Sequence, residues 1–367
     1  MKIKLVAILL FLLLIITCSE RNRGFKIGGN AIGFIENTTL YLEDLYAHEI
    51  IDSTRIADGQ FKFFGKVEEP SNYVIRTNNY SYVTRVWLDN SNITLEIRQD
   101  NSELIKISGS AAQNKIFELQ VRVRRLKDTL SGYKNWKIIQ GGSIPSSRIR
   151  VEKDSILQQI DKKYVDYIED NPNDYYSAYL LFSIIERIGK KQAAQLYNNF
   201  LPEVQKSNYG TYAYRYIRYS NELKIGGRAK NFGMRNVKGD IIYLNDFKGD
   251  FLLLSFWIAG NGVQPNFSNH SKSVEMNKDL NRFYKKYHSR GLNILSVSLD
   301  KNKQDWLKGI SRNKLIWHNV CDSEGFHGIV PITYNIKSVP TIILLGPDMY
   351  IVETDLLKIE ELLDRIY

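Results

Sequence analysis

Short runs in which apolar and polar residues alternate fill the chain from residue 25 to about residue 110. Turn-forming pairs such as Asp58-Gly59 and Asp89-Asn90 separate these runs. Successive side chains point to opposite faces of a β-strand, so a period of two predicts strands. Short strands at regular spacing are typical of an antiparallel sandwich or barrel. We therefore predict an N-terminal β-rich domain over residues 25–112.

The period of the apolar positions changes near Gln113, where helical spacing replaces alternation. Apolar residues then recur three or four positions apart, which places them on one face of an α-helix. Members of the first such series are Ile116, Leu119, Val123, Leu126 and Leu130. Similar patterns cover residues 156–168, 175–188, 190–204 and 209–223. The middle of the chain, residues 113–224, is therefore predicted to be α-helical.

Strands and helices alternate after the glycine-rich segment Ile225-Gly226-Gly227. The apolar pattern predicts strands over residues 241–243, 251–257, 294–299, 341–345 and 350–352, with the first two forming a β pair. Helices are expected over 304–311, over 358–366 and around Leu280, Phe283 and Tyr287. Such alternation, ending in a hairpin and a helix, indicates a compact α/β domain with a mixed sheet over residues 226–367.

The N-terminus has the pattern of an export signal. Lys2 and Lys4 precede an apolar run over residues 5–16, which is long enough for a signal-peptide core and too short to span a bilayer. Ile15-Ile16-Thr17-Cys18 resembles a bacterial lipobox, although Thr17 stands where Gly, Ala or Ser is usual. The resemblance implies a signal peptide over residues 1–17 and a lipid on Cys18 that anchors the protein to a membrane of the cell envelope, facing the periplasm. Secretion without a lipid is the alternative.

The composition indicates a folded globular protein, with 43 % hydrophobic and 25 % charged residues. The net charge of +10 would favour anionic surfaces, but the Lys and Arg residues are scattered, so no nucleic-acid groove is expected. The histidines at 270, 288, 318 and 327 lack the spacing of metal ligands, so we expect no metal site. Nothing in the sequence indicates a cofactor.

Four segments of the last domain resemble the thioredoxin superfamily, specifically the TlpA/ResA-like membrane-anchored thiol-disulfide oxidoreductases. They are residues 244–249, Phe256-Trp257, residues 294–300 and residues 338–341. The resemblance covers residues 226–367 and implies a cis peptide bond between Val339 and Pro340. Residues 51–54, 58–61 and 107–110 resemble a small β-domain of unknown function that precedes thioredoxin modules in many envelope lipoproteins.

The Cys-X-X-Cys pair that the family uses is missing, because Cys18 and Cys321 are the only cysteines of the sequence. Counted forward from Phe256-Trp257, the pair would fall on Asn261 and Gln264. Counted backward from Leu299-Asp300, it would fall on His270 and Ser273, and this count keeps the helical positions in register. The disagreement predicts an insertion over residues 260–269.

A serine and a histidine at a helix start could bind an anion or transfer a proton. We favour the simpler interpretation, in which Ser271 or Ser273 caps the helix. Thiol-disulfide exchange needs an attacking thiolate and a resolving thiol, and neither Ser nor His replaces them. No catalytic residue is therefore predicted.

The remaining function is binding, because a thioredoxin fold can pair an extended polypeptide with the backbone before its cis proline. The predicted contacts are Trp257, Val339, Pro340 and Thr341, and the partner is an envelope protein or an extended polypeptide. One alternative is an active oxidoreductase that uses Cys321 with a partner's thiol. Another is a lipoprotein whose β-domain is the working part.

Overall fold

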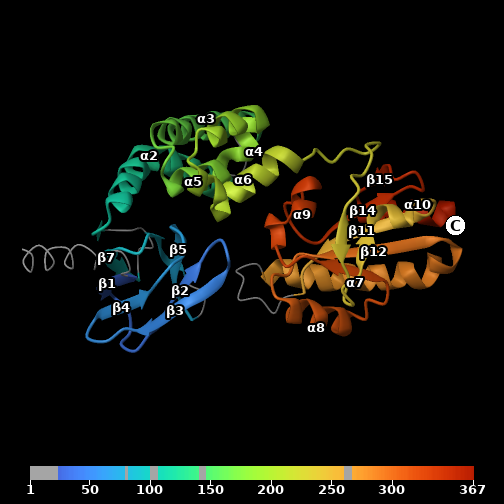
Figure 1. Cartoon of the computed structure of the whole chain (residues 1–367), viewed down its shortest axis with the longest axis horizontal. Helices are drawn as coiled ribbons and strands as arrows, with labels where there is room; N and C mark the ends of the chain where they lie inside the picture. Colours follow the sequence, from blue (N-terminus) through green and yellow to red (C-terminus); the bar gives the residue numbers. More distant parts are fainter. Residues whose placement is uncertain (1–23, 79–81, 100–105, 140–145, 260–266) are drawn as a thin grey trace, which may run out of the picture. The chain divides into compact units, whose positions relative to one another are not determined.

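The computed structural model describes residues 24–78, 82–99, 106–139, 146–259 and 267–367 (Figure 1). The chain divides into two compact units, Met1–Ala213 and Tyr214–Tyr367. The N-terminal unit contains the β-rich region together with most of the helical region. Residues 214–224, predicted as the end of the helical region, belong to the C-terminal unit.

The described strands of the N-terminal unit form a β-sandwich, as predicted. One sheet has the order β4-β1-β7-β8 and the other the order β3-β2-β5-β6. The strands are β1 (Phe25–Ile32), β2 (Thr39–Asp44), β3 (Glu49–Arg55), β4 (Gln60–Gly65), β5 (Ser71–Thr77), β6 (Tyr82–Leu88), β7 (Asn92–Arg98) and β8 (Lys106–Ser108). Alternation accounts for the shared core: in β4, Phe61 and Phe63 are buried while Lys62 between them is exposed.

One pair of neighbouring strands departs from the antiparallel prediction. β1 and β7 are parallel, with Ile27 opposite Ile93, while the other described pairs of the sandwich are antiparallel. The alternating pattern specifies which face of each strand is buried and carries no information on the direction of its neighbour.

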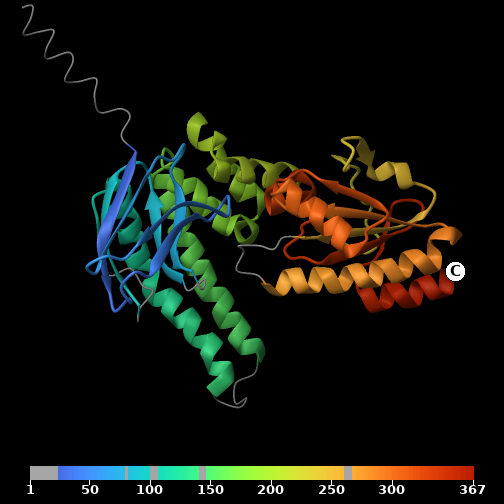
Figure 2. The same ribbon diagram turned by 90° about the horizontal axis from the view of Figure 1, so that it is seen from below.

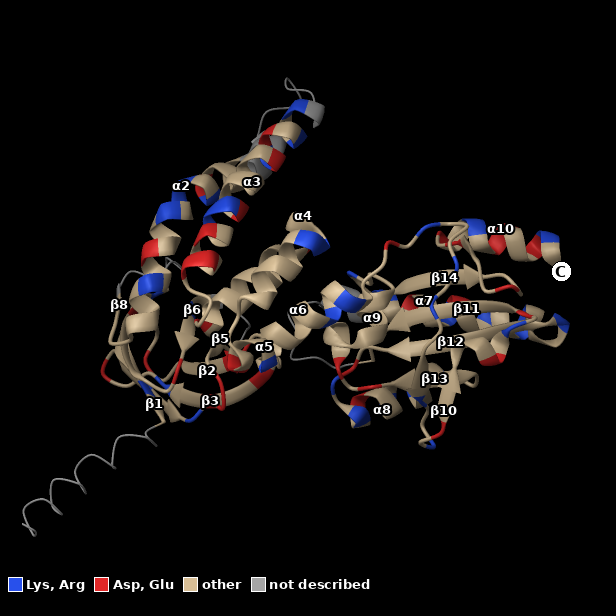
Figure 3. Cartoon of the chain, turned by 45° about the horizontal axis from the view of Figure 1, so that its top comes forward, with Lys and Arg blue, Asp and Glu red and all other residues tan. Residues whose placement is uncertain are grey.

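Helices complete the N-terminal unit. They are α2 (Ala111–Ile139), α3 (Ser146–Asp170), α4 (Tyr175–Asn198), α5 (Pro202–Lys206) and α6 (Asn208–Tyr219). Helix α6 continues into the C-terminal unit and ends at Tyr219, four residues before the predicted helix end at Leu223. Gly189 has φ 77° and kinks α4 where the sequence predicted a break between two helices. Lys/Arg and Asp/Glu residues are mixed along the described parts of α2 and α3 (Figure 3), which fits the scattered charge of the sequence.

The C-terminal unit is built on a sheet of order β13-β12-β11-β14-β15. Its strands are β11 (Phe251–Trp257), β12 (Leu292–Ser298), β13 (His318–Cys321), β14 (Thr341–Leu345) and β15 (Ile351–Glu353). β11, β12 and β13 are parallel, and β14 and β15 form the predicted antiparallel hairpin. The mixed α/β sheet is therefore confirmed.

One face of this sheet is covered by α7 (Phe267–Tyr287), α8 (Lys303–Asn313) and α10 (Leu356–Ile366). Leu253 and Trp257 of β11 pack on that side with Phe283 of α7. α7 and α10 lie side by side (Figure 2), joined by Arg282–Glu360 and Lys286–Asp364 ion pairs.

The opposite face is covered by β9 (Gly233–Arg235), β10 (Ile241–Tyr243), the 3-10 helix η1 (Leu244–Phe247) and α9 (Ile329–Thr333). The predicted pairing of 241–243 with 251–257 is wrong, because β10 pairs with β9 instead. The chain between β9 and β10 is short enough to close a hairpin, which local pairing favours. The 3-10 helices η2 (His288–Arg290) and η3 (Gly325–His327) complete the unit.

Within the described ranges, no helix is both long and apolar enough to cross a membrane.

Candidate functional site

The end of β11 is the point at which a thioredoxin fold would place its reactive group. β11, β12 and β13 are parallel, so their carboxyl ends meet at one edge of the sheet, and β14 enters at the same edge. The side chains at this edge come from α7, from the loop after β12 and from α8.

Three side chains hold the chain as it leaves β11. The Ser273 hydroxyl accepts a hydrogen bond from the Ile258 N–H at 3.4 Å. Both carboxylate oxygens of Asp300 accept from the Ala259 N–H, at 3.1 and 2.8 Å. The Arg312 guanidinium donates to the Ala259 carbonyl at 2.7 Å. The two residues after Trp257 are therefore fixed by polar groups that are far away in sequence.

Asp300 is 3 % exposed, and its carboxylate is itself oriented. The Ser298 hydroxyl donates to it at 2.6 Å. A buried carboxylate is costly unless hydrogen bonds compensate for the lost water, and these contacts supply them. Asp300 thus supports the backbone that follows β11.

Ser273 is one of the two predicted positions of the missing cysteine pair that fall on α7, and its side chain is buried. It is 0 % exposed and lies well inside the helix, which begins at Phe267. The capping interpretation of Ser271 and Ser273 is therefore wrong, because a cap residue precedes the first turn. Ser273 instead binds the backbone after β11 from within the second turn of the helix.

The side chains at the other positions predicted for the missing Cys-X-X-Cys pair lie outside the described residues. His270 lies in α7, but its side chain is outside the described residues. Asn261, Gln264 and most of the predicted insertion over residues 260–269 also lie outside them, and residues 267–269 are helical.

The loop before β14 carries the expected cis peptide bond between Val339 and Pro340. The Val339 side chain is buried in the core, while Pro340 and Thr341 are half-buried and Ser338 is exposed. The Thr341 hydroxyl donates to the Ser338 carbonyl at 2.8 Å. Within the described residues, neither the N–H nor the carbonyl of Val339 is hydrogen-bonded.

Trp257 was predicted to contact a peptide, but its side chain is 0 % exposed and belongs to the core beneath the site. Its position at the last residue of a central strand, with alternate side chains facing opposite cores, accounts for this burial. Trp257 therefore packs in the core next to the site, and its contact with a peptide stays a prediction.

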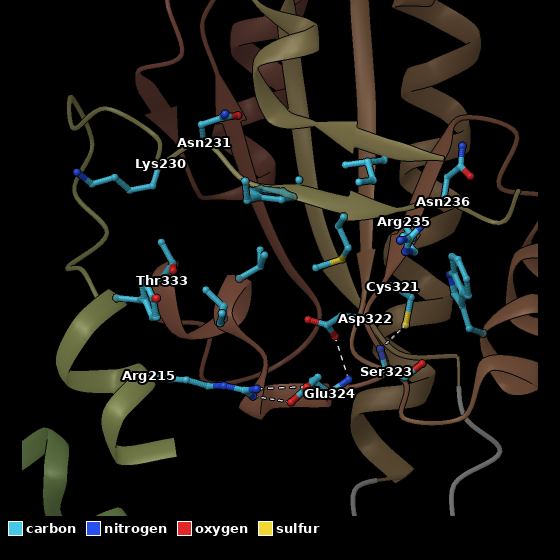
Figure 4. Close-up of a pocket in the computed structure, with 18 of the residues that line it drawn as sticks. Arg215, Lys230, Asn231, Arg235, Asn236, Cys321, Asp322, Ser323, Glu324 and Thr333 are labelled. Atoms are coloured by element: carbon cyan, nitrogen blue, oxygen red, sulfur yellow. Dashed lines mark hydrogen bonds and ion pairs between the residues drawn. The ribbon is translucent and has the colours of Figure 1, made fainter. Parts of the chain in front are cut away.

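Cys321 is the free cysteine of the described residues. It ends β13, where its Sγ accepts a hydrogen bond from the Ser323 N–H at 3.4 Å (Figure 4). The Sγ also donates to the Asp300 carbonyl at 3.4 Å. Burial raises the pKa of the thiol, and the charge of Asp322 raises it further. A protonated buried thiol is a poor nucleophile.

The described residues contain no group of three or more His, Cys, Asp or Glu side chains that could hold a metal ion.

Asp300 belongs to a segment that the sequence pattern singles out, whereas Arg312 was not predicted to take part in the site. An aspartate directly after an apolar strand is a usable signal for a residue at the functional edge of an α/β sheet. Arg312 leaves no such signal, because it lies at the far end of α8 and reaches Ala259 only through the fold.

Comparison with known proteins agrees with this geometry. Residues 250–351 match a family model described as thioredoxin-like, and residues 25–116 match one described as a domain of unknown function, DUF4369. The thiol-disulfide oxidoreductase ResA of Bacillus thuringiensis subsp. konkukian is 26 % identical over 138 residues, which are 38 % of this chain and 73 % of the relative.

Two solved structures are similar in sequence over the same region. The thioredoxin domain of a thiol-disulfide oxidoreductase from Bacteroides vulgatus is 29 % identical and covers 39 % of this chain and 99 % of its own, with a TM-score of 0.34. A thiol-disulfide oxidoreductase from Bacteroides fragilis is 30 % identical and covers 37 % and 99 %, with a TM-score of 0.32. Residues 250–351 therefore form a thioredoxin-like domain that is similar in sequence to thiol-disulfide oxidoreductases, a DUF4369 domain lies ahead of it, and the sequence has no Cys-X-X-Cys pair.

Proposed function

We propose that the C-terminal unit binds an extended polypeptide along residues 338–341 and performs no thiol-disulfide exchange. The observation that carries the proposal is the unpaired backbone of Val339, whose N–H and carbonyl find no partner among the described residues. A backbone N–H and carbonyl that have no partner in the free protein gain hydrogen bonds when an extended strand pairs with them.

The lack of redox chemistry is supported by two positions that the structure describes, Ser273 and Cys321. Ser273 accepts a hydrogen bond from the backbone after β11, and Cys321 is buried, which raises the pKa of its thiol. Exchange requires an attacking thiolate and a second thiol that resolves the mixed disulfide. An oxidoreductase that uses Cys321 with a partner's thiol is the competing function.

The binding proposal is tested by site-specific crosslinking on the full chain. A benzophenone amino acid replaces exposed Ser338, or Ser311 on the exposed surface of α8 as the matched control. The probe is reduced, carboxymethylated lactalbumin, which stays unfolded and offers no thiol. We expect a crosslink from position 338 and none from position 311. Equal yields from both positions, or no crosslink from 338, would contradict the proposal.

The redox alternative is tested separately by insulin reduction. We expect no turnover from the unmodified chain and none from Cys321→Ser. Turnover that disappears in Cys321→Ser would instead establish the oxidoreductase.

We also propose that the protein is exported and tethered to an envelope membrane through a lipid on Cys18. The apolar run over residues 5–16 followed by Cys18 supports this, as does the pairing of a DUF4369 domain with a thioredoxin-like one. In cells fed radiolabelled palmitate, the label is expected on the protein and absent from Cys18→Ser, which should leave the membrane fraction. A labelled Cys18→Ser variant would refute the tether.

A further inference from the structure

A pocket of about 970 Å³ lies within the C-terminal unit, and none of residues 338–341 lines it. Its walls come from the end of α6, the segment before β9, the β9–β10 hairpin, the start of α8, the loop after β13 and α9 (Figure 4). A pocket of this size is at the upper end of the range for small ligands and also accommodates a few residues of a polypeptide.

Basic side chains outnumber acidic ones around the pocket, with five against two. The basic residues are Arg215, Arg218, Lys230, Arg235 and Lys303, and the acidic ones are Asp322 and Glu324. The Arg215 guanidinium pairs with Glu324 at 2.5 Å and donates to the His327 carbonyl at 2.8 Å, so this cation is already neutralised. The excess of positive charge therefore comes from the other four.

Three of those four cations are available to a ligand. Arg235 donates to the Gly239 carbonyl at 2.8 Å. Arg218, Lys230 and Lys303 form no ion pair among the described residues. They come from α6, from the segment before β9 and from the first residue of α8, so they are distributed around the pocket and do not converge on one point.

Apolar side chains lie between the cations. Phe232, Met234, Ile241 and Ile329 line the pocket, and Ile241 and Ile329 are among the exposed large apolar residues of the unit. Exposed apolar surface bordered by charge is typical of an interaction site. A compact anion would use neither the apolar walls nor the separated cations.

From this charge complementarity we propose that the pocket binds an acidic polypeptide segment, whose carboxylates meet Arg218, Lys230 and Lys303 while its apolar side chains contact Phe232 and Met234. Charges at a partly exposed pocket contribute mainly specificity and association rate, and salt weakens them. Binding here is independent of the strand pairing proposed at residues 338–341.

The test uses the full chain and fluorescence anisotropy of a labelled peptide of alternating Glu and Leu. The variant Arg218→Glu/Lys230→Glu is compared with Lys278→Glu/Lys285→Glu, which makes the same charge change at exposed positions of α7. We expect the pocket variant to weaken binding by about tenfold or more and the α7 variant to change it by less than about twofold. Circular dichroism and thermal melting confirm that each variant is folded.

Three competing probes decide the chemistry of the ligand. The counterpart peptide with Lys in place of Glu, citrate, and vesicles of phosphatidylglycerol are expected to bind or compete more weakly than the Glu-Leu peptide. The proposal is overturned if both double variants lose binding equally, if the Lys peptide binds as well, or if citrate or vesicles are preferred. Crosslinking from position 338 is also measured in both double variants. A result at the pocket can then be distinguished from a result at residues 338–341.

Discussion

Both carboxylate oxygens of Asp300 lie within hydrogen-bonding distance of the Ala259 N–H, at 3.1 and 2.8 Å. This contact joins the loop after β12 to the residue that follows Ile258, at the edge where a thioredoxin fold would place a redox pair. In this protein the same edge is held by a set of buried polar contacts. Its residues maintain the shape of the site in the absence of a reactive thiol.

Replacing Asp300 with Asn should measure how much that contact stabilises the C-terminal unit. Asn keeps the size of the side chain and loses the charge, so the free energy of unfolding is expected to fall by about 1.5–3 kcal/mol, the range for hydrogen bonds to charged groups. Urea denaturation followed by tryptophan fluorescence gives the value. Asp250→Asn is the control, because Asp250 is exposed and its carboxylate accepts a hydrogen bond only from the Asn293 side chain among the described contacts. Equal losses in the two variants would contradict the role of Asp300.

Ser273→Ala tests the interpretation that this position now has a structural role. The Ile258 N–H would lose its acceptor, the hydroxyl of the fully buried Ser273, at an expected cost of about 1–2 kcal/mol in the free energy of unfolding. Ser289→Ala, at an exposed position after α7, should change it by less than about 0.5 kcal/mol. If Ser273→Ala were as stable as the unmodified chain, the hydroxyl would not be holding β11 to α7.

The sequence pattern was sufficient for elements whose burial follows a simple period. The apolar run of β11 predicted a central strand, and the spacing of Leu280, Phe283 and Tyr287 predicted the buried face of α7. All three residues are 1 % exposed or less.

Pairing partners and long-range contacts could not be predicted in this way. The parallel neighbours β1 and β7, and the hydrogen bond from Arg312 to Ala259, depend on chain segments that only the fold brings together. The start of α7 was also misplaced, because the family count fixes a register within the helix and not the residue at which the helix begins.

Cys321 should react slowly with alkylating reagents in the folded protein. Burial raises the pKa of its thiol, so the thiolate is scarcer than in a free cysteine at the same pH. In a Cys18→Ser background, iodoacetamide at about pH 8 is expected to modify the native chain at least about tenfold more slowly than the urea-unfolded chain. Mass spectrometry of the digested product locates the modification. Equal rates in the two states would show that Cys321 is accessible and ionised.

The same pKa shift sets a pH dependence of stability. The unfolded chain releases the Cys321 proton at about pH 8.5, whereas the folded chain retains it to a higher pH. The contribution of this group to stability is therefore complete below that pH and is lost as the pH rises above it. Cys321→Ala should have a shallower decline in the free energy of unfolding between about pH 8 and pH 10 than the unmodified chain. If the free energy of unfolding of Cys321→Ala declined more steeply with pH than that of the unmodified chain, the pKa of Cys321 would be lowered by folding and not raised.

Gly309 in α8 faces the end of β11 so closely that a side chain cannot be added there. A Cβ at this position would lie 2.1 Å from the Ala259 Cβ and 3.0 Å from the Trp257 ring. Because Ala259 is held by Asp300 and Arg312, it cannot move away without breaking those hydrogen bonds. Gly309→Ala is therefore expected to lower the free energy of unfolding by about 1–3 kcal/mol, even though Ala is the better helix former.

Ser311→Ala, at an exposed position of the same helix, should be neutral or slightly stabilising, because Ala also improves helix propensity there. Melting temperatures of the two variants separate the cost of crowding from the gain in propensity. If Gly309→Ala melted at or above the temperature of Ser311→Ala, α8 would be free to shift away from β11. The hydrogen bonds at Ala259 would then not be what fixes the end of that strand.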